Sequence, residues 1–107
     1  MKLLLDECLD VRLRDHLPGH EPFTVIFMQW DGTKNGALLS LAASHQFDAL
    51  VTTDAPIEQQ QNPATLPVAI VILHAKSNAL RGLLPLVPNL LKKLATLQPR
   101  TIVHVWP

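Results

Sequence analysis

The sequence predicts an α/β domain: a three-layer sandwich with a mostly parallel, four- to five-stranded sheet. Two apolar runs, residues 2–5 and 49–53, each lead directly into an acidic residue. Continuous apolar runs of this length are typical of strands that are buried on both faces, as in parallel sheets. Segments with helical periodicity alternate with the strand-like runs. This alternation favours parallel strands that are connected by helices through right-handed crossovers.

The composition is that of an ordinary folded domain, with 48% hydrophobic and 17% charged residues. Nine basic residues balance nine acidic ones, so the chain lacks the overall positive field that many nucleic-acid-binding proteins use. The single cysteine excludes an internal disulfide and favours a reducing compartment. No apolar run approaches the ~20 residues of a membrane span, and the N-terminus lacks a signal-peptide pattern. We therefore expect a cytoplasmic protein with no membrane contact.

The first part of the chain predicts a strand, a helix and a second strand. Residues 2–5 form the first strand. Leucines at positions 9, 13 and 17 recur every fourth residue, which predicts a short amphipathic helix. Pro18-Gly19 ends this helix, because proline cannot continue it and glycine tolerates the exit conformation. Residues 23–28 are rich in β-branched and aromatic side chains and predict the second strand.

The middle of the chain continues the alternation. Asn35 is expected to be the N-cap of the second helix. The third strand covers residues 49–53, and one helical turn is expected after Pro56 in a polar loop. Residues 68–73 are the most hydrophobic run of the chain. They predict a central or next-to-central strand.

A leucine-rich segment and a last strand complete the domain, which we expect to span residues 1–107. Leucines between positions 80 and 94 follow a helical period that Pro85 and Pro88 interrupt. Because an interior proline costs about 3 kcal/mol in a helix, we expect a short first turn and then a main helix from near Pro85 to about Thr96. Residues 101–106 predict the last strand, with an antiparallel edge position as one option.

Carboxylates follow two of the expected strands. Asp6 and Glu7 come directly after the first strand, and Asp54 follows the third. If these strands are parallel neighbours, the three side chains meet at the edge where open α/β sheets bind ligands. Clustered carboxylates repel unless a cation neutralises them, and hard oxygen ligands favour Mg²⁺ or Mn²⁺. The alternative is that the aspartates only stabilise turns and helix N-termini. The neighbouring Cys8 is expected to be a small buried hydrophobic residue.

Four motifs occur in order along nearly the whole chain. They are Leu4-Leu5-Asp6-Glu7 followed by Leu9, Leu17-Pro18-Gly19-His20-Glu21, Asn35-Gly36-Ala37-Leu38-Leu39, and Thr52-Thr53-Asp54 with Gln60-Gln61-Asn62 downstream. Together they resemble the PIN-like domain family, specifically a branch of short, free-standing bacterial proteins that are discussed as toxin-type ribonucleases.

The resemblance implies a Mg²⁺-dependent phosphodiesterase that acts on RNA, with Asp6 and Asp54 as metal ligands. The hypothetical mechanism is metal-assisted hydrolysis. The cation polarises the scissile phosphate and activates a water, and Glu7 acts as a second ligand or orients that water. In this interpretation the protein is the toxin of a toxin–antitoxin pair. Its expected partners are single-stranded RNA, an antitoxin protein and a second copy of the chain.

The chain also departs from the family pattern. Many PIN-like relatives have an acid near the start of the second helix, where this chain has Asn35, and another where it has Pro56. Asn35 can still offer an amide oxygen to a metal or substrate. Asp31 and Glu58 are the candidates for supplying a missing charge.

Further polar residues are expected at the same edge. Gln60 and Asn62 are interpreted either as orienting the metal ligands and contacting phosphate, or as fixing the loop backbone. Lys34 and Lys76 are candidates for phosphate contacts, with solvated loop lysines as the alternative. The five histidines show no metal-ligand spacing and are expected at the surface or at helix ends.

Two other functions are compatible with the sequence. Receiver domains of signalling proteins also place acids after the first strand, bind Mg²⁺ there and carry a phosphoacceptor aspartate after the third. A receiver, however, has a hydroxyl residue closing the fourth strand and a lysine closing the fifth, whereas this chain has Leu73-His74 and Val105-Trp106. The third interpretation is a catalytically inactive PIN-like domain that binds a partner protein.

Overall fold

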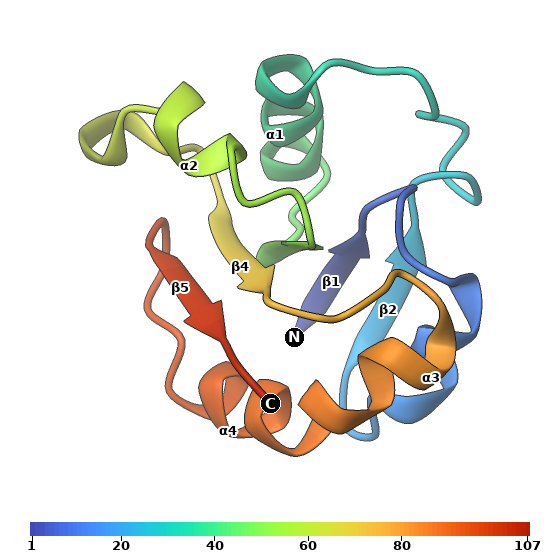
Figure 1. Cartoon of the computed structure of the whole chain (residues 1–107). Coiled ribbons are helices and arrows are strands. Elements are labelled where there is room, and N and C mark those ends of the chain that lie inside the picture. Colours follow the sequence, from blue (N-terminus) through green and yellow to red (C-terminus); the bar gives the residue numbers. More distant parts are fainter.

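Five parallel strands form one sheet at the centre of the computed structural model, which describes residues 1–107 (Figure 1). The order across the sheet is β2-β1-β3-β4-β5, and every neighbouring pair is parallel. The expected α/β class with a parallel sheet is therefore confirmed. The strands are β1 (Lys2–Leu5), β2 (Glu21–Thr24), β3 (Ala49–Thr52), β4 (Ala69–Leu73) and β5 (Ile102–Val105).

Helical segments connect the strands. The α-helices are α1 (Asn35–Ser44), α2 (Ile57–Gln60), α3 (Leu80–Leu83) and α4 (Val87–Ala95). Three short 3₁₀ helices are η1 (Val11–His16), η2 (Pro63–Thr65) and η3 (Leu84–Leu86). No helix is both long enough and apolar enough to cross a lipid bilayer.

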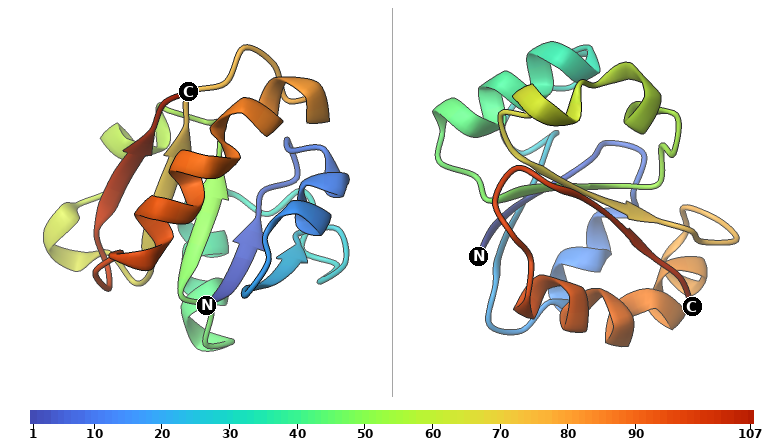
Figure 2. Two further views of the ribbon diagram at one scale, coloured as in Figure 1. Left: turned by 90° about the horizontal axis from the view of Figure 1, so that it is seen from below. Right: turned by 90° about the vertical axis from the view of Figure 1, so that its left-hand side faces the viewer.

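The helices cover both faces of the sheet and make three layers, which Figure 2 shows edge-on in its right-hand view. Successive residues of a strand point to opposite faces, so each buried strand contributes to two separate cores. Val51 and Val71 pack on the face covered by η1, α3 and α4, and Leu50 and Ile70 pack on the face covered by α1 and α2. This two-sided burial explains why β1, β3 and β4 read as continuous apolar runs rather than alternating ones.

The second strand is displaced from its expected position. It covers Glu21–Thr24 instead of residues 23–28. The Thr24 hydroxyl accepts a hydrogen bond from the Phe27 backbone N–H at 3.0 Å, and the Thr24 carbonyl accepts one from the Met28 N–H at 3.1 Å. These bonds turn the chain away from the sheet, so Phe27 is 65% exposed despite its high strand propensity.

The last strand is also corrected, because β5 lies parallel to β4 and the antiparallel option is wrong. The segment before it behaves largely as expected. The first turn is α3, Pro85 lies in η3, and α4 begins at Val87 and ends at Ala95. This helical crossover returns the chain to the starting end of the sheet, and β5 therefore runs in the same direction as β4.

Two local expectations about helices are revised. The helix after β1 is the 3₁₀ helix η1, although its expected apolar positions Leu9, Leu13 and Leu17 are all buried. Asn35 does not cap α1: it is the first helical residue, Lys34 occupies the N-cap position, and no side chain caps the helix. The helical turn expected after Pro56 is confirmed as α2.

Candidate functional site

The carboxyl ends of β1 and β3 meet at the point where the strand order of the sheet reverses. β1 pairs with β2 on one side and with β3 on the other, and Leu5 lies opposite Val51. Chain connections leave in opposite directions from this point, which opens the crevice where α/β sheets of this order bind ligands. Asp6 continues β1 and donates its backbone N–H to the Val51 carbonyl at 3.0 Å. The expectation that the strands leading to Asp6 and Asp54 are parallel neighbours is confirmed.

A single buried hydroxyl connects the two aspartates. Thr52, the last residue of β3, is 0% exposed. Its Oγ1 donates to Asp6 Oδ2 at 2.7 Å and accepts from the Asp54 backbone N–H at 3.0 Å. A hydroxyl has one proton to donate, so this contact fixes its direction toward the carboxylate. The sequence analysis includes Thr52 in a motif but gives its hydroxyl no role, although a threonine two residues before an acid at a strand end is the pattern of a local side-chain-to-backbone bond.

The Asp54 carboxylate is held from α1 and α2. Asn35 Nδ2 donates to Asp54 Oδ2 at 3.2 Å and to Gln60 Oε1 at 3.0 Å. An ionised carboxylate only accepts hydrogen bonds, so the amide nitrogen of Asn35 must face Asp54. The amide oxygen of Asn35 and Oδ1 of Asp54 have no hydrogen-bond partner within the protein. The structure thus brings together three of the residues singled out in the sequence.

A shallow polar hollow of about 550 Å³ lies beside this cluster. It is lined by Lys34, Asn35 and Gln60, together with Thr33, Gly36 and Gln61. Lys34 therefore lies where its ammonium group can reach an anion that enters the hollow.

Two candidate residues lie elsewhere. Asn62 Oδ1 accepts from the Ala64 backbone N–H at 3.0 Å and caps η2, which is the backbone-fixing role considered as its alternative. Lys76 lines a different cavity of about 190 Å³, together with Arg81 and Pro107. Neither side chain forms a hydrogen bond or an ion pair with Asp6, Asp54 or Asn35.

Glu7 points toward the loop that follows β2. Its Oε1 accepts from the Gly32 backbone N–H at 3.2 Å, and its own N–H donates to Asp6 Oδ1 at 2.9 Å. No group of three or more His, Cys, Asp or Glu side chains lies close enough together to hold a metal ion. The three carboxylates share one edge of the sheet, but only Asp6 and Asp54 are tied to each other through Thr52.

Cys8 also lies at this edge, and the expectation that it is buried is wrong. The side chain is exposed. Its Sγ lies 3.4 Å from Thr53 Oγ1 and 3.8 Å from Asp6 Oδ2. The turn after β1 presents these residues outward, because only Leu9 of this segment packs into the core.

Glu58, also in α2, belongs to a separate network with His104 and His74. Its Oε1 lies 3.0 Å from Nε2 of His104, and Nδ1 of His104 lies 2.8 Å from Nε2 of His74. The His74 ring stacks on Trp106 with 3.6 Å between ring centroids. Glu58 therefore does not supply a charge beside Asp54. The two histidines are half-buried in this network.

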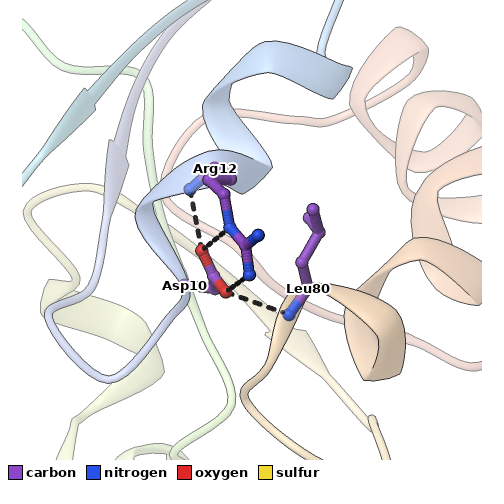
Figure 3. Close-up of polar contacts among 3 residues, drawn as sticks. All are labelled: Asp10, Arg12 and Leu80. Carbon is purple, nitrogen blue, oxygen red and sulfur yellow. Dashed lines mark hydrogen bonds and ion pairs between the residues drawn. The ribbon is translucent and has the colours of Figure 1, made fainter.

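Asp10, the N-cap of η1, connects the start of η1 to the start of α3, as Figure 3 shows. Asp10 Oδ1 accepts from the Arg12 backbone N–H at 3.0 Å, and Asp10 Oδ2 accepts from Arg12 Nη2 at 2.7 Å and from the Leu80 N–H at 3.2 Å. The Arg12 side-chain hydrogen bonds, followed by the backbone bonds, hold the pKa of Asp10 well below its usual range. Asp10 was not singled out in the sequence, and its role is structural.

The lowered pKa of Asp10 predicts a loss of stability in acid. A carboxyl group with a lowered folded-state pKa contributes fully above its unfolded pKa of about 3.9, and this contribution is lost as the pH falls toward the folded value. Asp10→Asn should therefore lower the free energy of unfolding near neutral pH and flatten its decline below about pH 4. Urea unfolding of both proteins across this range measures the effect. Equal pH dependence in the two proteins would contradict it.

The charges of Asp6 and Asp54 lead to a prediction about the melting temperature. Two nearby carboxylates repel when no cation is bound. Asp54→Asn removes one charge and keeps an oxygen that accepts from Asn35, so we expect the metal-free protein to gain about 1 kcal/mol, or about 4 °C in Tm. The same change should remove stabilisation by millimolar Mg²⁺.

The alternative role of Asp54, as a residue that stabilises the turn, gives the opposite sign. Asp54→Asn would then lower the stability by roughly 0.5 to 2 kcal/mol, and Mg²⁺ would shift neither protein. Asp6→Asn is a less direct variant, because asparagine has one acceptor oxygen, whereas Asp6 accepts from the Glu7 N–H with one oxygen and from the Thr52 hydroxyl with the other. Differential scanning fluorimetry with and without Mg²⁺ separates the two roles.

Comparison of the chain with family models, with curated proteins and with solved structures found no match. The resemblance to PIN-like domains therefore stays a prediction from the sequence.

Proposed function

We propose that the protein is a Mg²⁺- or Mn²⁺-dependent ribonuclease that hydrolyses phosphodiester bonds, with Asp6 and Asp54 as the metal ligands. The observation that carries the proposal is the Thr52 hydroxyl, which holds the Asp6 carboxylate and the backbone of Asp54 at the point where the strand order reverses. Because this buried hydroxyl hydrogen-bonds to both acidic residues, it fixes their positions. Acidic residues fixed at this edge of the sheet are the arrangement expected of a cation-dependent site.

The residues present fit a hard cation. The side chains of Asp6, Asp54 and Asn35 offer carboxylate and amide oxygens, and Oδ1 of Asp54 and the amide oxygen of Asn35 have no hydrogen-bond partner. Mg²⁺ commonly uses one or two protein carboxylates and completes its coordination with water and substrate phosphates. Two aspartates are therefore a sufficient protein contribution, although no third acidic side chain joins them.

Each residue of the site has a task in this proposal. Asp6 and Asp54 would hold the cation, which would supply Lewis-acid chemistry for the phosphate and a more acidic bound water. Asn35 holds the Asp54 carboxylate in position through its amide nitrogen. Lys34, beside the polar hollow, attracts the phosphate backbone of RNA. Glu7, exposed next to Asp6, accepts a proton from water or orients it.

The test is cleavage of labelled single-stranded RNA by the purified protein. We expect slow cleavage in Mn²⁺ or Mg²⁺ and none after a chelator removes the metal. Restoring the metal should restore cleavage, which distinguishes this activity from contaminating ribonucleases that need no metal. Cleavage that persists in chelator, or no cleavage with either metal, would contradict the proposal.

A second candidate function is a receiver-like phosphoacceptor domain with Asp54 as the acceptor. The observation that favours it is the strand order, which is the 2-1-3-4-5 order of flavodoxin-like folds. Against it, the ends of β4 and β5 present Leu73-His74 and Val105-Trp106 rather than a hydroxyl and a lysine. Incubation with acetyl phosphate and Mg²⁺ tests it, because phosphorylation adds the mass of one phosphoryl group and Asp54→Asn abolishes the addition.

The toxin and inactive-domain hypotheses are tested in cells. As the toxin of a toxin–antitoxin pair, the protein should arrest bacterial growth when expressed alone, and Asp54→Asn should relieve the arrest. If the protein is instead an inactive PIN-like binding module, both forms should leave growth unchanged and neither should cleave RNA in vitro.

A further inference from the structure

The outer edge of β5 presents an unpaired row of backbone groups. The carbonyls of Thr101 and Val105 accept from the backbone N–H groups of Ile70 in β4 and of His74 directly after it, both at 2.9 Å. Because alternate residues of a strand face opposite neighbours, the intervening residues Ile102 and His104 direct their N–H and C=O groups away from the sheet. No strand lies on that side, since β5 is the last in the order. The right-hand view of Figure 2 faces this edge and shows β5 crossing in front of the other strands.

A groove of about 700 Å³ runs between this edge and α4. Its lining includes Val103 and Val105 of the strand and Trp106 directly after it. Lys92 and Lys93 line it from the helix. No acidic residue lines it, and neither lysine forms an ion pair. The groove is therefore positively charged on its helix side and apolar on its strand side.

Asn89 closes one end of the groove. Its Nδ2 donates to the Trp106 carbonyl at 2.8 Å. The row of unpaired backbone groups thus begins at Ile102 and ends at His104. This length suits a short extended segment.

We propose that this edge binds an extended, acidic segment of a partner protein, which adds a sixth strand to the sheet. Strand addition satisfies the free N–H and C=O groups of Ile102 and His104. In a paired strand, alternate side chains point to the same face as those of Val103 and Val105, which is the face that α4 covers. Acidic residues at every second position therefore meet Lys92 and Lys93. This inference is independent of the ribonuclease proposal.

Other occupants fit the groove less well. A second copy that pairs through β5 brings the same lysines of both copies to one interface, which is repulsive. Single-stranded RNA matches the lysines but leaves the alternating backbone donors and acceptors unpaired. One face of the Trp106 ring already stacks on His74 with 8° between the rings, which halves the surface it offers for base stacking.

The test uses two short synthetic peptides and NMR of the labelled protein. One peptide alternates glutamate with valine, and the other has lysine in place of glutamate. With the acidic peptide we expect slowed hydrogen exchange at the Ile102 and His104 amides, because these become paired, and little change at Val103 and Val105, which already pair with β4. The lysine peptide should change none of the four. No slowed exchange with the acidic peptide would overturn the proposal.

Variants identify the groups responsible. Reversing both lysines, Lys92→Glu with Lys93→Glu, should weaken peptide binding by about tenfold or more in fluorescence anisotropy. The matched control reverses Arg14 and Arg81, which lie outside the groove, and should leave binding unchanged. Ile102→Pro removes an outward N–H without touching the bonds to β4 and should also weaken binding.

The competing occupants give different results. Labelled RNA that binds with the same dependence on Lys92 and Lys93, without protection of the Ile102 and His104 amides, would overturn the proposal in favour of a nucleic-acid surface. Protection of these amides that grows with protein concentration, without any peptide, would overturn it in favour of self-association. Analytical ultracentrifugation provides the independent measure of that outcome.

Discussion

Asp54→Asn is expected to lower RNA cleavage by at least about a hundredfold in saturating Mn²⁺ or Mg²⁺. The substitution keeps the shape of the side chain and its contact with Asn35, but it removes one of the two negative charges that hold the cation at the edge of the sheet. Because the fold is kept, the missing charge should weaken metal binding as well as slow cleavage, so that half-maximal cleavage needs a higher metal concentration. A titration of cleavage rate against metal concentration measures both.

Asp15→Asn is the matched control for this experiment. Asp15 is highly exposed on η1, and its only ion pair is a 3.9 Å contact with Arg14. The control makes the same chemical change far from the polar hollow and should cleave like the parent. If Asp54→Asn cleaves as fast as Asp15→Asn, the activity belongs to another protein or to another part of this one.

Thr52→Val is expected to lower the free energy of unfolding by about 2 to 3 kcal/mol. Valine fills the same volume, but it leaves Asp6 Oδ2 without its 2.7 Å donor and the Asp54 N–H without its acceptor. Both groups lie beside a fully buried position, so water cannot easily replace the hydroxyl as their hydrogen-bond partner. Urea denaturation of the parent and the variant measures the difference.

Thr52→Ser separates the hydroxyl from the methyl group. Serine retains both hydrogen bonds and loses one buried methyl, for which we expect a cost of about 1 kcal/mol. RNA cleavage by the serine variant should stay close to that of the parent, whereas the valine variant should lose most of its activity through misplaced acids. A larger stability loss in the serine variant than in the valine variant would show that packing, rather than hydrogen bonding, is what Thr52 contributes.

The sequence predicts best the parts of this fold that depend on burial. β1, β3 and β4 each lie within a continuous apolar run, because both faces of these strands are covered. From this pattern alone, Asp6 and Asp54 could be placed at one edge of the sheet. β2 is at the edge of the sheet, and there the local turn formed by Thr24 overrides the strand propensity of Phe27.

Contacts between distant residues could not be predicted in the same way. Thr52 reads as an ordinary β-branched residue of a buried strand, and only the pairing of β3 with β1 brings its hydroxyl to Asp6. Asn35 is a residue type that is preferred at N-caps, yet its side-chain amide donates to Asp54, 19 positions away. The direction of β5 likewise depends on the path of the preceding helices rather than on its own residues.

The all-parallel sheet also governs how the chain can fold. No two of its strands are joined by a hairpin, and even the nearest partners, Lys2 of β1 and Glu21 of β2, are 19 positions apart. β1 is an inner strand of the sheet, but its second neighbour, β3, begins only at Ala49. During synthesis the apolar side chains of β1 therefore stay exposed to solvent until much of the chain has been made. Such high contact order favours folding over roughly milliseconds to seconds rather than microseconds, and a nascent chain of this kind depends on rapid completion or on chaperones to avoid aggregation.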